Sequence, residues 1–470
     1  MRRILLVATL LSGCVWQPAS IEPEPLRFRD CRDGFECAEL RVPIDHERPR
    51  GEQIALSLLR RPAGKPAERI GVLLVNPGGP GISAVEYLRN SAPRWSAQLR
   101  DRFDLVAFDT RGTGASGGLD CHESLAAYLE QNPTPVSDAE WASALAVSRA
   151  LAEECARNRE ALLPRMGSAE SARDMDRVRV ALGVEQISYL GFSYGTALGA
   201  SYARQFPGRV RAMVLDGAID PGFDLLTFVA EQAEAVEAAL LAWDEAALRE
   251  GWHGIAELER VYARAKSAPI PSAAGGRAAQ ASDVLYGSVE AVIEPVAGWQ
   301  ELALALDAAL RADGGAFVRL ADRYFRRRSD GSSGLRVDAQ LAVLCADLHR
   351  PASPDAYREA LPEIDRRAPH IGSANLTSFL PCAFWPEPAR RPEPLRDVPG
   401  GRILVLAGRD DPLTPHVWGE RLARALPGSL LISVDTRGHT AYGQGHACVD
   451  VPVTGFLVSA VQPMSTPVCP

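Results

Sequence analysis

A serine stands at the centre of the pentapeptide GFSYG, residues Gly191–Gly195. This pentapeptide directly follows the apolar run Ile187–Leu190 and precedes a stretch of small residues, Thr196–Arg204, that is able to form a helix. The glycines permit the tight strand-to-helix turn that lifts a serine hydroxyl above a sheet, where the helix amino end favours negative charge. The pattern predicts that Ser193 is a nucleophile, and an ordinary turn is the alternative.

A serine nucleophile needs a base to remove its proton and an acid to orient that base. His439 follows the apolar run Leu430–Val434, and Asp410 and Asp411 follow the run Ile403–Ala407. The order serine, aspartate, histidine is one of the known orders of such a triad. We therefore expect His439 to be the base and one of the two aspartates to be the acid.

A glycine-rich turn, Asn76–Gly81, follows the apolar run Ile70–Val75. Glycines let backbone N–H groups face a substrate because no Cβ stands in the way. We expect the N–H groups of Gly79 and Tyr194 to form an oxyanion hole. A simple turn is the alternative.

A second glycine pattern, Gly112–Gly117, matches the dinucleotide fingerprint G-x-G-x-x-G. The residues that follow it do not continue as a helix, so no helix amino end is available for a pyrophosphate. The cysteines lack paired C-x-x-C spacing, and no H-E-x-x-H motif is present. The sequence therefore predicts neither a cofactor nor a metal.

Continuous apolar runs bounded by turn residues indicate strands that are buried on both faces of a sheet. The runs are Ile70–Val75, Leu105–Phe108, Ile187–Leu190, Ala212–Leu215, Ile403–Ala407 and Leu430–Val434, after two alternating runs, Glu39–Ile44 and Gln53–Leu59. Helical stretches between them favour a mostly parallel sheet of the α/β class. Residues 216–401 have a mainly helical pattern and predict a cap inserted between core segments 28–215 and 402–470.

The amino-terminal segment is typical of an exported lipoprotein. Met1–Gly13 has two arginines, an apolar run and small residues, which predicts a signal peptide. The tetrapeptide Leu11–Cys14 resembles the bacterial lipobox, so we expect lipidation at Cys14 and a tether over residues 14–27. This predicts a protein that is anchored to a membrane on the exported side. A plain signal peptide or a buried strand is the alternative.

The amino-acid composition further restricts the classes of protein to which the chain could belong. The chain has 470 residues, 46% of them hydrophobic, and a formal net charge of −8, which argues against a nucleic-acid partner. Its nine cysteines are many for a cytosolic enzyme. If Cys14 is lipidated, eight remain, an even number that fits disulfides in an oxidising compartment.

The motifs together resemble the α/β-hydrolase family of secreted tripeptidyl aminopeptidases, which are relatives of prolyl aminopeptidases. The resemblance runs from about Phe28 to the C-terminus and rests on Asn76–Gly81, Phe108–Gly114, Gly191–Gly195, Asp411–Pro415 and Gly438-His439. It implies serine exopeptidase chemistry on peptides with a free N-terminus, without a cofactor. Since the family motif D-P-V-T-P aligns with Asp411–Pro415, the resemblance implies that Asp411, rather than Asp410, completes the triad.

The resemblance also bears on the cysteines, because Cys345, Cys382, Cys448 and Cys469 are similar to family positions. Sequence proximity then suggests Cys31–Cys37, Cys121–Cys155, Cys345–Cys382 and Cys448–Cys469, out of about a hundred possible pairings. Free buried thiols are the alternative.

Substrate recognition stays open at this point. An acidic residue of the cap is a natural partner for a substrate ammonium group, and Glu231, Glu234 and Glu237 lie on a predicted cap helix. Three acidic residues at this spacing also fit a solvated helix face. The alternatives to a peptidase are an esterase on the same fold and a non-catalytic, ligand-binding surface lipoprotein.

Overall fold

The structure is a computed structural model. It describes residues 23–470, apart from 120, 221, 223, 294–296, 328–336, 352, 396, 397, 399, 465–468 and 470. The expected signal peptide and the lipidation site at Cys14 lie outside the described residues. No helix in the described part of the chain is both long and apolar enough to cross a membrane.

The described residues form one nine-stranded sheet with the order β1-β2-β3-β5-β4-β6-β7-β8-β9. The strands are β1 (Arg29–Asp30), β2 (Glu36–Pro43), β3 (Gln53–Arg61), β4 (Gly71–Asn76), β5 (Phe103–Phe108), β6 (Ile187–Phe192), β7 (Val210–Asp216), β8 (Ile403–Gly408) and β9 (Leu430–Val434). The first three pair antiparallel, β3 pairs antiparallel with β5, and β4 to β9 are parallel. All six continuous apolar runs are parallel strands, which confirms the predicted α/β class.

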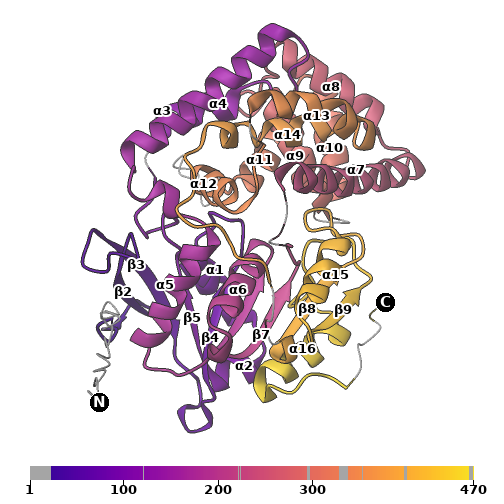
Figure 1. The fold of residues 1–470 in the computed structure, drawn as a ribbon. Helices are drawn as coiled ribbons and strands as arrows, with labels where there is room; N and C mark the ends of the chain where they lie inside the picture. The colour runs from indigo at the N-terminus through magenta and orange to yellow at the C-terminus, as the bar shows by residue number, and fades with distance from the viewer. Residues whose placement is uncertain are drawn as a thin grey trace, which may run out of the picture.

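Helices cover both faces of the sheet (Figure 1). These core helices are α1 (Ala84–Ser91), α2 (Ala97–Arg102), α5 (Ser168–Ala181), α6 (Tyr194–Gln205), α15 (His416–Ala425) and α16 (Ala447–Ser459). Successive residues of β4 point to opposite faces, so Val72 and Leu74 pack with α5, α6 and α15, and Leu73 and Val75 pack with α1, α2 and α16. Because both faces are covered, the strands contain no polar alternation.

A helical layer lies above the carboxyl ends of the parallel strands (Figure 1). It contains α7 (Leu225–Arg249), α8 (Ile255–Ser267), α9 (Ala281–Ile293), α10 (Ala297–Leu310), α11 (Gly315–Tyr324), α12 (Val337–Asp347), α13 (Pro354–Arg367) and α14 (Gly372–Thr377). Helices α7 to α11 share a hydrophobic core of their own with α14. This layer is the cap that the sequence predicts as an insertion between β7 and β8.

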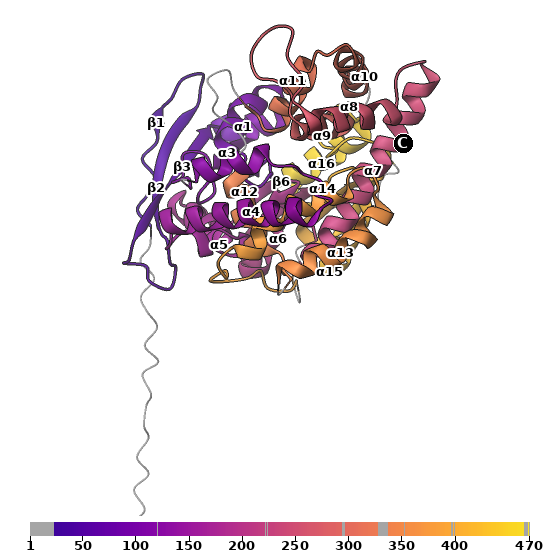
Figure 2. The ribbon, with the colours of Figure 1, turned by 90° about the horizontal axis from the view of Figure 1, so that it is seen from above.

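The structure adds two earlier helices to the cap, α3 (His122–Glu130) and α4 (Asp138–Asn158). Seen from above, they cross the molecule beside α12 and α14 (Figure 2). The Tyr128 hydroxyl donates to the Ser378 carbonyl at 2.7 Å, and the Thr377 hydroxyl donates to the Pro133 carbonyl at 2.6 Å. Residues assigned to the core by their place in the sequence therefore pack on the cap.

Four disulfides are present, and each is the pair that sequence proximity suggested. They join Cys31 to Cys37, Cys121 to Cys155, Cys345 to Cys382 and Cys448 to Cys469. Two of them tie cap segments together, since Cys121 directly precedes α3 and Cys155 lies on α4, while Cys345 lies on α12. The described residues contain no cluster of histidine, cysteine and carboxylate groups that could hold a metal ion.

The loop after β5, which contains the second glycine pattern, has two buried charged residues, Asp109 and Arg111. The Asp109 carboxylate accepts hydrogen bonds from the Ser83 hydroxyl and from the backbone N–H groups of Val85 and Ala115, at 2.8–3.1 Å. A Cβ on Gly114 would lie 2.1 Å from that carboxylate, so the glycine is required by close packing. The glycines of this pattern thus serve packing.

We expect Arg111→Met to lower the free energy of unfolding by about 3–5 kcal/mol. The Arg111 guanidinium is fully buried and makes two 2.7 Å bonds to Asp174, as well as bonds to the carbonyls of Pro43 and Ile44. Its removal leaves the Asp174 carboxylate buried without its main counter-charge. Urea unfolding with the disulfides intact measures the effect.

Arg209→Met, at an exposed ion pair with Glu185, is the matched control and should cost at most about 1 kcal/mol. Equal losses in the two variants would contradict the prediction.

Candidate active site

Ser193 occupies the turn between β6 and α6, in the backbone conformation that the glycine pattern predicts. Its φ is +52° and its ψ is −125°, a strained combination for a residue with a side chain. The turn is held in place by a hydrogen bond from the Ser193 N–H to the Asp216 carbonyl at 2.8 Å. Such a turn presents the serine hydroxyl at the carboxyl edge of the sheet, beneath the cap.

The flanking glycines are required because β6 and α6 come very close to their neighbours. A Cβ on Gly195 would lie 2.6 Å from the Asn76 carbonyl oxygen, and a Cβ on Gly191 would lie 2.5 Å from the Gly195 carbonyl oxygen. Neither position tolerates a side chain without a backbone shift. Steric exclusion therefore explains both glycines of the pentapeptide.

The structure joins His439 to Asp411. The His439 Nδ1 atom lies 3.0 and 2.9 Å from the two carboxylate oxygens of Asp411. Asp410 points elsewhere: its side chain is 63% exposed, and it lies 3.8 Å from Arg437. Of the two aspartates that the residues alone left open, only Asp411 contacts the histidine.

The surroundings of Asp411 keep its carboxyl group ionised. Burial by itself raises its pKa, but the His439 imidazole and hydrogen bonds from the N–H groups of Thr414 and Leu413 outweigh burial, and the pKa is lowered. These N–H groups donate to one carboxylate oxygen, each at 2.9 Å, and the Thr414 hydroxyl donates to the other at 2.8 Å. A fixed anion at this position orients the imidazole and stabilises its protonated form.

A second buried carboxylate, Asp216, lies next to the triad. It is the last residue of β7, and it accepts hydrogen bonds from the N–H groups of Ala441 (3.0 Å) and Tyr442 (2.7 Å) in the loop that carries His439. Its carbonyl accepts from Ser193, so one residue contacts both the nucleophile turn and the histidine loop. Asp216 follows the apolar run Ala212–Leu215, as Asp410 and Asp411 follow the run Ile403–Ala407, so the same kind of signal could have found it.

We expect kcat/KM to fall below about pH 6 more steeply than one ionisation allows. An unperturbed imidazole titrates near pH 6.5, and protonation removes the base function of His439. Burial raises the pKa of Asp216 to about 6, while Asp411 stays ionised, so Asp216 takes up a proton in the same range and weakens its hold on the histidine loop. A pH profile of the parent and of Asp216→Asn, which should follow one ionisation, measures the difference. A flat parent profile from about pH 5 to 8 would contradict the role of His439.

Protonation of Asp216 at low pH affects stability and activity in opposite directions: it stabilises the fold while activity falls. Because the folded protein holds the Asp216 proton more tightly than the unfolded chain does, the stabilisation from that proton is complete below about pH 4. It is lost as the pH rises through about 6.

The two expected oxyanion donors lie on either side of the nucleophile turn. Tyr194 is the first residue of α6, so its N–H belongs to the helix turn whose amides have no acceptor within the helix. Gly79 has a φ of +104° and lines the same cavities as Ser193. A Cβ on the preceding Gly78 would lie 2.9 Å from the Tyr194 nitrogen. The glycine turn and the helix start thus come close together beside Ser193.

The Tyr194 side chain connects this turn to the cap. Its hydroxyl donates to the Asp347 carboxylate at 3.0 Å, and the Ser168 N–H donates to the same group at 2.9 Å. Burial raises the pKa of Asp347 to about 6, although hydrogen bonds from Ser168 and Tyr194 act against it. Asp347 has no local sequence signal for this role, because its partners are far away in the chain.

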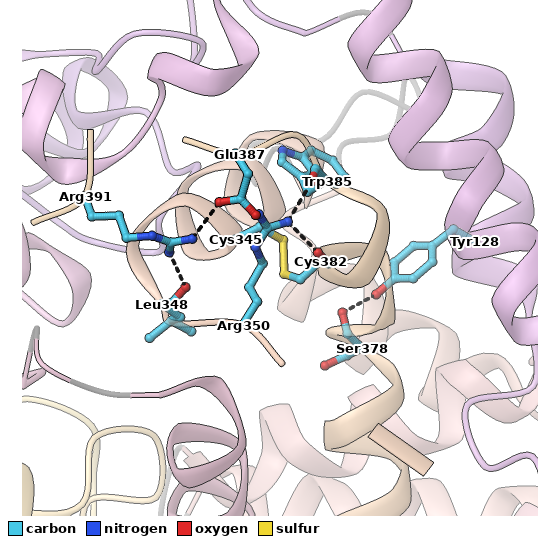
Figure 3. Close-up of a disulfide and its surroundings, with 9 residues drawn as sticks. All are labelled: Tyr128, Cys345, Leu348, Arg350, Ser378, Cys382, Trp385, Glu387 and Arg391. Carbon is cyan, nitrogen blue, oxygen red and sulfur yellow. Dashed lines mark hydrogen bonds and ion pairs between the residues drawn. A yellow bond between two sulfur atoms is a disulfide. The ribbon is translucent and has the colours of Figure 1, made fainter. Parts of the chain in front are cut away.

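The disulfide between Cys345 and Cys382 holds the helix that carries Asp347 (Figure 3). Arg350 lies beside the disulfide and donates to the carbonyls of Cys382 and Trp385 at 2.7 and 2.6 Å. The covalent link and these bonds fix the end of α12 against the segment around Cys382. They therefore support the contact between the cap and the nucleophile turn.

Two cavities meet at Ser193. The larger has a volume of about 1260 Å³ and is lined by Ser193, His439 and residues of the cap. The smaller, about 150 Å³, is lined by Ser193 and mainly by apolar and aromatic side chains, among them Tyr128, Phe228 and Tyr286. Ser193 and Gly79 line both cavities, whereas His439 lines only the larger.

The three cap glutamates considered as ammonium partners all have other partners. Glu231 bonds to Arg421 at 2.7 Å and to the Trp418 indole N–H, and Glu234 bonds to Arg367 at 2.5 Å. Glu237 contacts the ring of His370. None of the three lines either cavity at Ser193. Neither an ammonium site nor a fully solvated face describes them, because Glu231 and Glu234 join α7 to α15 and α13, and Glu237 joins it to the turn after α13.

The fold and the site together define a serine hydrolase of the α/β-hydrolase class. Residues 71–249 match the model of the alpha/beta hydrolase fold family, and residues 368–469 match the model described as TAP-like protein. The chain is 32% identical to serine protease Hip1 of Mycobacterium tuberculosis, over 98% of this chain and 96% of that protein. It belongs to this family of α/β hydrolases with a TAP-like C-terminal region.

Two further relatives carry different names. Carboxylesterase B of Mycobacterium tuberculosis is 36% identical over 92% of this chain and 86% of its own length. Tripeptidyl aminopeptidase of Streptomyces lividans is 29% identical over 95% of this chain and 85% of its own length. The family therefore includes both peptidase and esterase names.

Proposed function

We propose that the protein is a serine peptidase that releases short peptides or single residues from the free N-terminus of peptides. The observation that carries the proposal is that His439, which is paired with Asp411, lines the same cavity as Ser193 at its strained strand-to-helix turn. The relatives named serine protease and tripeptidyl aminopeptidase support the choice of peptides as substrates.

The reaction follows from these positions. Ser193 Oγ attacks the scissile carbonyl carbon while its proton passes to His439, and the N–H groups of Gly79 and Tyr194 stabilise the oxyanion. The C–N bond then breaks, and His439 returns the proton to the leaving nitrogen, which yields an acyl-enzyme. Water attacks the acyl carbon with His439 again as the base, and Ser193 recovers its proton. Asp411 stays ionised throughout.

We infer that the two cavities hold the two sides of the scissile bond. Because His439 gives its proton to the leaving group, the leaving group lies on the His439 side, in the larger cavity. The acyl portion then lies in the smaller cavity, where aromatic and aliphatic side chains favour an apolar residue next to the scissile bond.

A panel of substrates tests the proposal. Tripeptidyl and aminoacyl nitroanilides with free N-termini are compared with their N-acetylated forms and with short acyl esters, and Ser193→Ala provides the background rate. We expect free N-termini to raise kcat/KM at least about tenfold over blocked ones, because acetylation removes the ammonium charge by which an aminopeptidase selects its substrate. Equal cleavage of free and blocked peptides would contradict an aminopeptidase.

A carboxylic ester hydrolase is the second candidate. The described residues that line the smaller cavity include no carboxylate, so that cavity offers no counter-charge to an ammonium group. The identity of 36% to carboxylesterase B supports the same candidate. Hydrolysis of acyl esters without any hydrolysis of peptide anilides in the panel would favour it.

We also propose that the protein is exported and anchored to a membrane through a lipid on Cys14. The signal-like segment and the lipobox tetrapeptide support this proposal, and four disulfides fit an oxidising compartment. Metabolic labelling with a fatty-acid analogue tests it. We expect label in the parent and none in Cys14→Ala, and an unlabelled parent would contradict the proposal.

A further inference from the structure

The larger cavity has a marked excess of arginine. Its charged lining residues are Arg94, Arg319, Arg323, Arg326, Arg327, Glu290, Asp322 and Asp450. Five guanidinium groups against three carboxylates give this cavity a positive balance, although the whole chain has a formal net charge of −8. A cavity with one sign of charge concentrates ligands of the opposite sign.

Part of this charge is neutralised within the protein. Arg323 lies 3.6 Å from Glu290, and Arg327 lies 2.9 Å from Asp322. Asp450 accepts hydrogen bonds from two backbone N–H groups of the histidine loop, Gly443 at 2.7 Å and Gly445 at 3.2 Å. These groups have partners of their own in the folded protein.

Three arginines of the larger cavity lack such a partner in the described part of the chain. Arg94, Arg319 and Arg326 are exposed to solvent in the cavity, and none has an ion-pair partner among the residues that the structure describes. They come from separate segments: Arg94 ends a short helix after α1, Arg319 lies on α11, and Arg326 follows α11. The fold thus gathers three unpaired cations around one cavity.

Two of these arginines lie close to the nucleophile turn. The Tyr87 ring packs edge-on against Phe192, the residue before Ser193, with ring centroids 5.9 Å apart. Burial raises the pKa of Tyr87 to about 12, while the charges of Arg326 and Arg94 act in the opposite direction. Arg94 and Arg326 line the larger cavity together with Tyr87 and His439.

We propose that Arg94, Arg319 and Arg326 bind a carboxylate on the leaving portion of the substrate, so that the enzyme prefers peptides with an anionic leaving segment. The carboxylate is either the C-terminus of a short leaving peptide or an acidic side chain within it. This inference rests on the proposed peptidase function, because it places the leaving group beside His439.

Peptides that share one acyl portion test the inference. The acyl portion is the one that the substrate panel identifies. It is joined to one of three leaving segments: an alanyl dipeptide with a free C-terminus, the same dipeptide with an amidated C-terminus, or an amidated dipeptide that contains glutamate. The uncharged nitroanilide of the same acyl portion is the reference. Chromatography of the products gives kcat/KM at low and at high salt.

We expect the parent to favour at least one of the two carboxylate peptides over the neutral amide by about three- to tenfold at low salt, and less at high salt. A preference for the free C-terminus or for glutamate identifies which carboxylate is bound. The ratio should fall towards one in the triple variant R94Q/R319Q/R326Q, whose folding is monitored by fluorophosphonate labelling of Ser193. Arg41→Gln, at an exposed arginine of β2 outside the cavity, should keep the parent ratio.

A parent that cleaves all three peptides equally, or a triple variant that keeps the preference, would overturn the inference. Failure of the parent to cleave the nitroanilide, while it hydrolyses esters, would overturn the peptidase proposal instead. The two failures are therefore distinguishable.

Discussion

Ser193→Ala is expected to lower kcat by at least about four orders of magnitude and to abolish labelling by a fluorophosphonate probe. In the proposed mechanism the hydroxyl oxygen of Ser193 forms the covalent bond to the acyl group, and alanine has no atom that replaces it. The strained backbone of Ser193 exists in the folded protein to present this one atom, and alanine keeps the backbone while removing the atom.

Ser91→Ala is the matched control. Ser91 lines the same cavity but has no role in the proposed reaction, so its replacement should leave labelling and hydrolysis close to those of the parent. Labelling that persists in Ser193→Ala would assign the nucleophile to another residue. A parent that is never labelled would favour the non-catalytic surface lipoprotein.

Asp411→Asn is expected to lower kcat by about three to four orders of magnitude with little change in KM. The amide group of asparagine donates a hydrogen bond towards Nδ1 of His439, which favours the tautomer whose other nitrogen carries the proton. That tautomer cannot accept a proton from Ser193. Steady-state kinetics on the best substrate of the panel, at a pH near 8, measures the loss.

Asp410→Asn separates the two aspartates in the same experiment. Asp410 is exposed and lies beside Arg437 at the surface, so its replacement should change kcat less than about twofold. A large loss in Asp410→Asn with a small loss in Asp411→Asn would reverse the assignment. Because the pKa of Asp411 is lowered, its ionisation stabilises the fold above the pKa of the unfolded chain, near pH 4, and this contribution is lost only as the pH falls further.

Local sequence patterns were sufficient to predict the strands of the core and the turn at Ser193. The apolar runs predicted all six parallel strands, since a strand buried on both faces is mainly apolar, and this property is visible in four to six consecutive residues. The pentapeptide Gly191–Gly195 predicted the nucleophile turn for a similar reason, because only glycine fits where a Cβ would lie 2.5 to 2.6 Å from a neighbouring backbone oxygen.

The cap was predicted only in outline. Its helices were recognised from their spacing, but α3 and α4 were assigned to the core because they precede β6 in the sequence. Their place on the cap depends on contacts such as Tyr128 with Ser378, which are 250 residues apart. The partners of Glu231, Glu234 and Glu237 could not be predicted either, since they lie on α15, on α13 and in the turn after α13.

The sequence by itself predicted the fold class, the candidate residues Ser193, Asp411 and His439, and, as one suggestion among many pairings, the four disulfides. Each of these depends on a short motif, on sequence proximity or on the family resemblance. Only the tertiary structure decided that Asp216 contacts both the nucleophile turn and the histidine loop, that Asp347 bonds to Tyr194, and that five arginines line the larger cavity. The physical reason is that charge and hydrogen bonding act across distances of a few ångströms in space, and folding brings these groups together from segments that lie far apart in the chain.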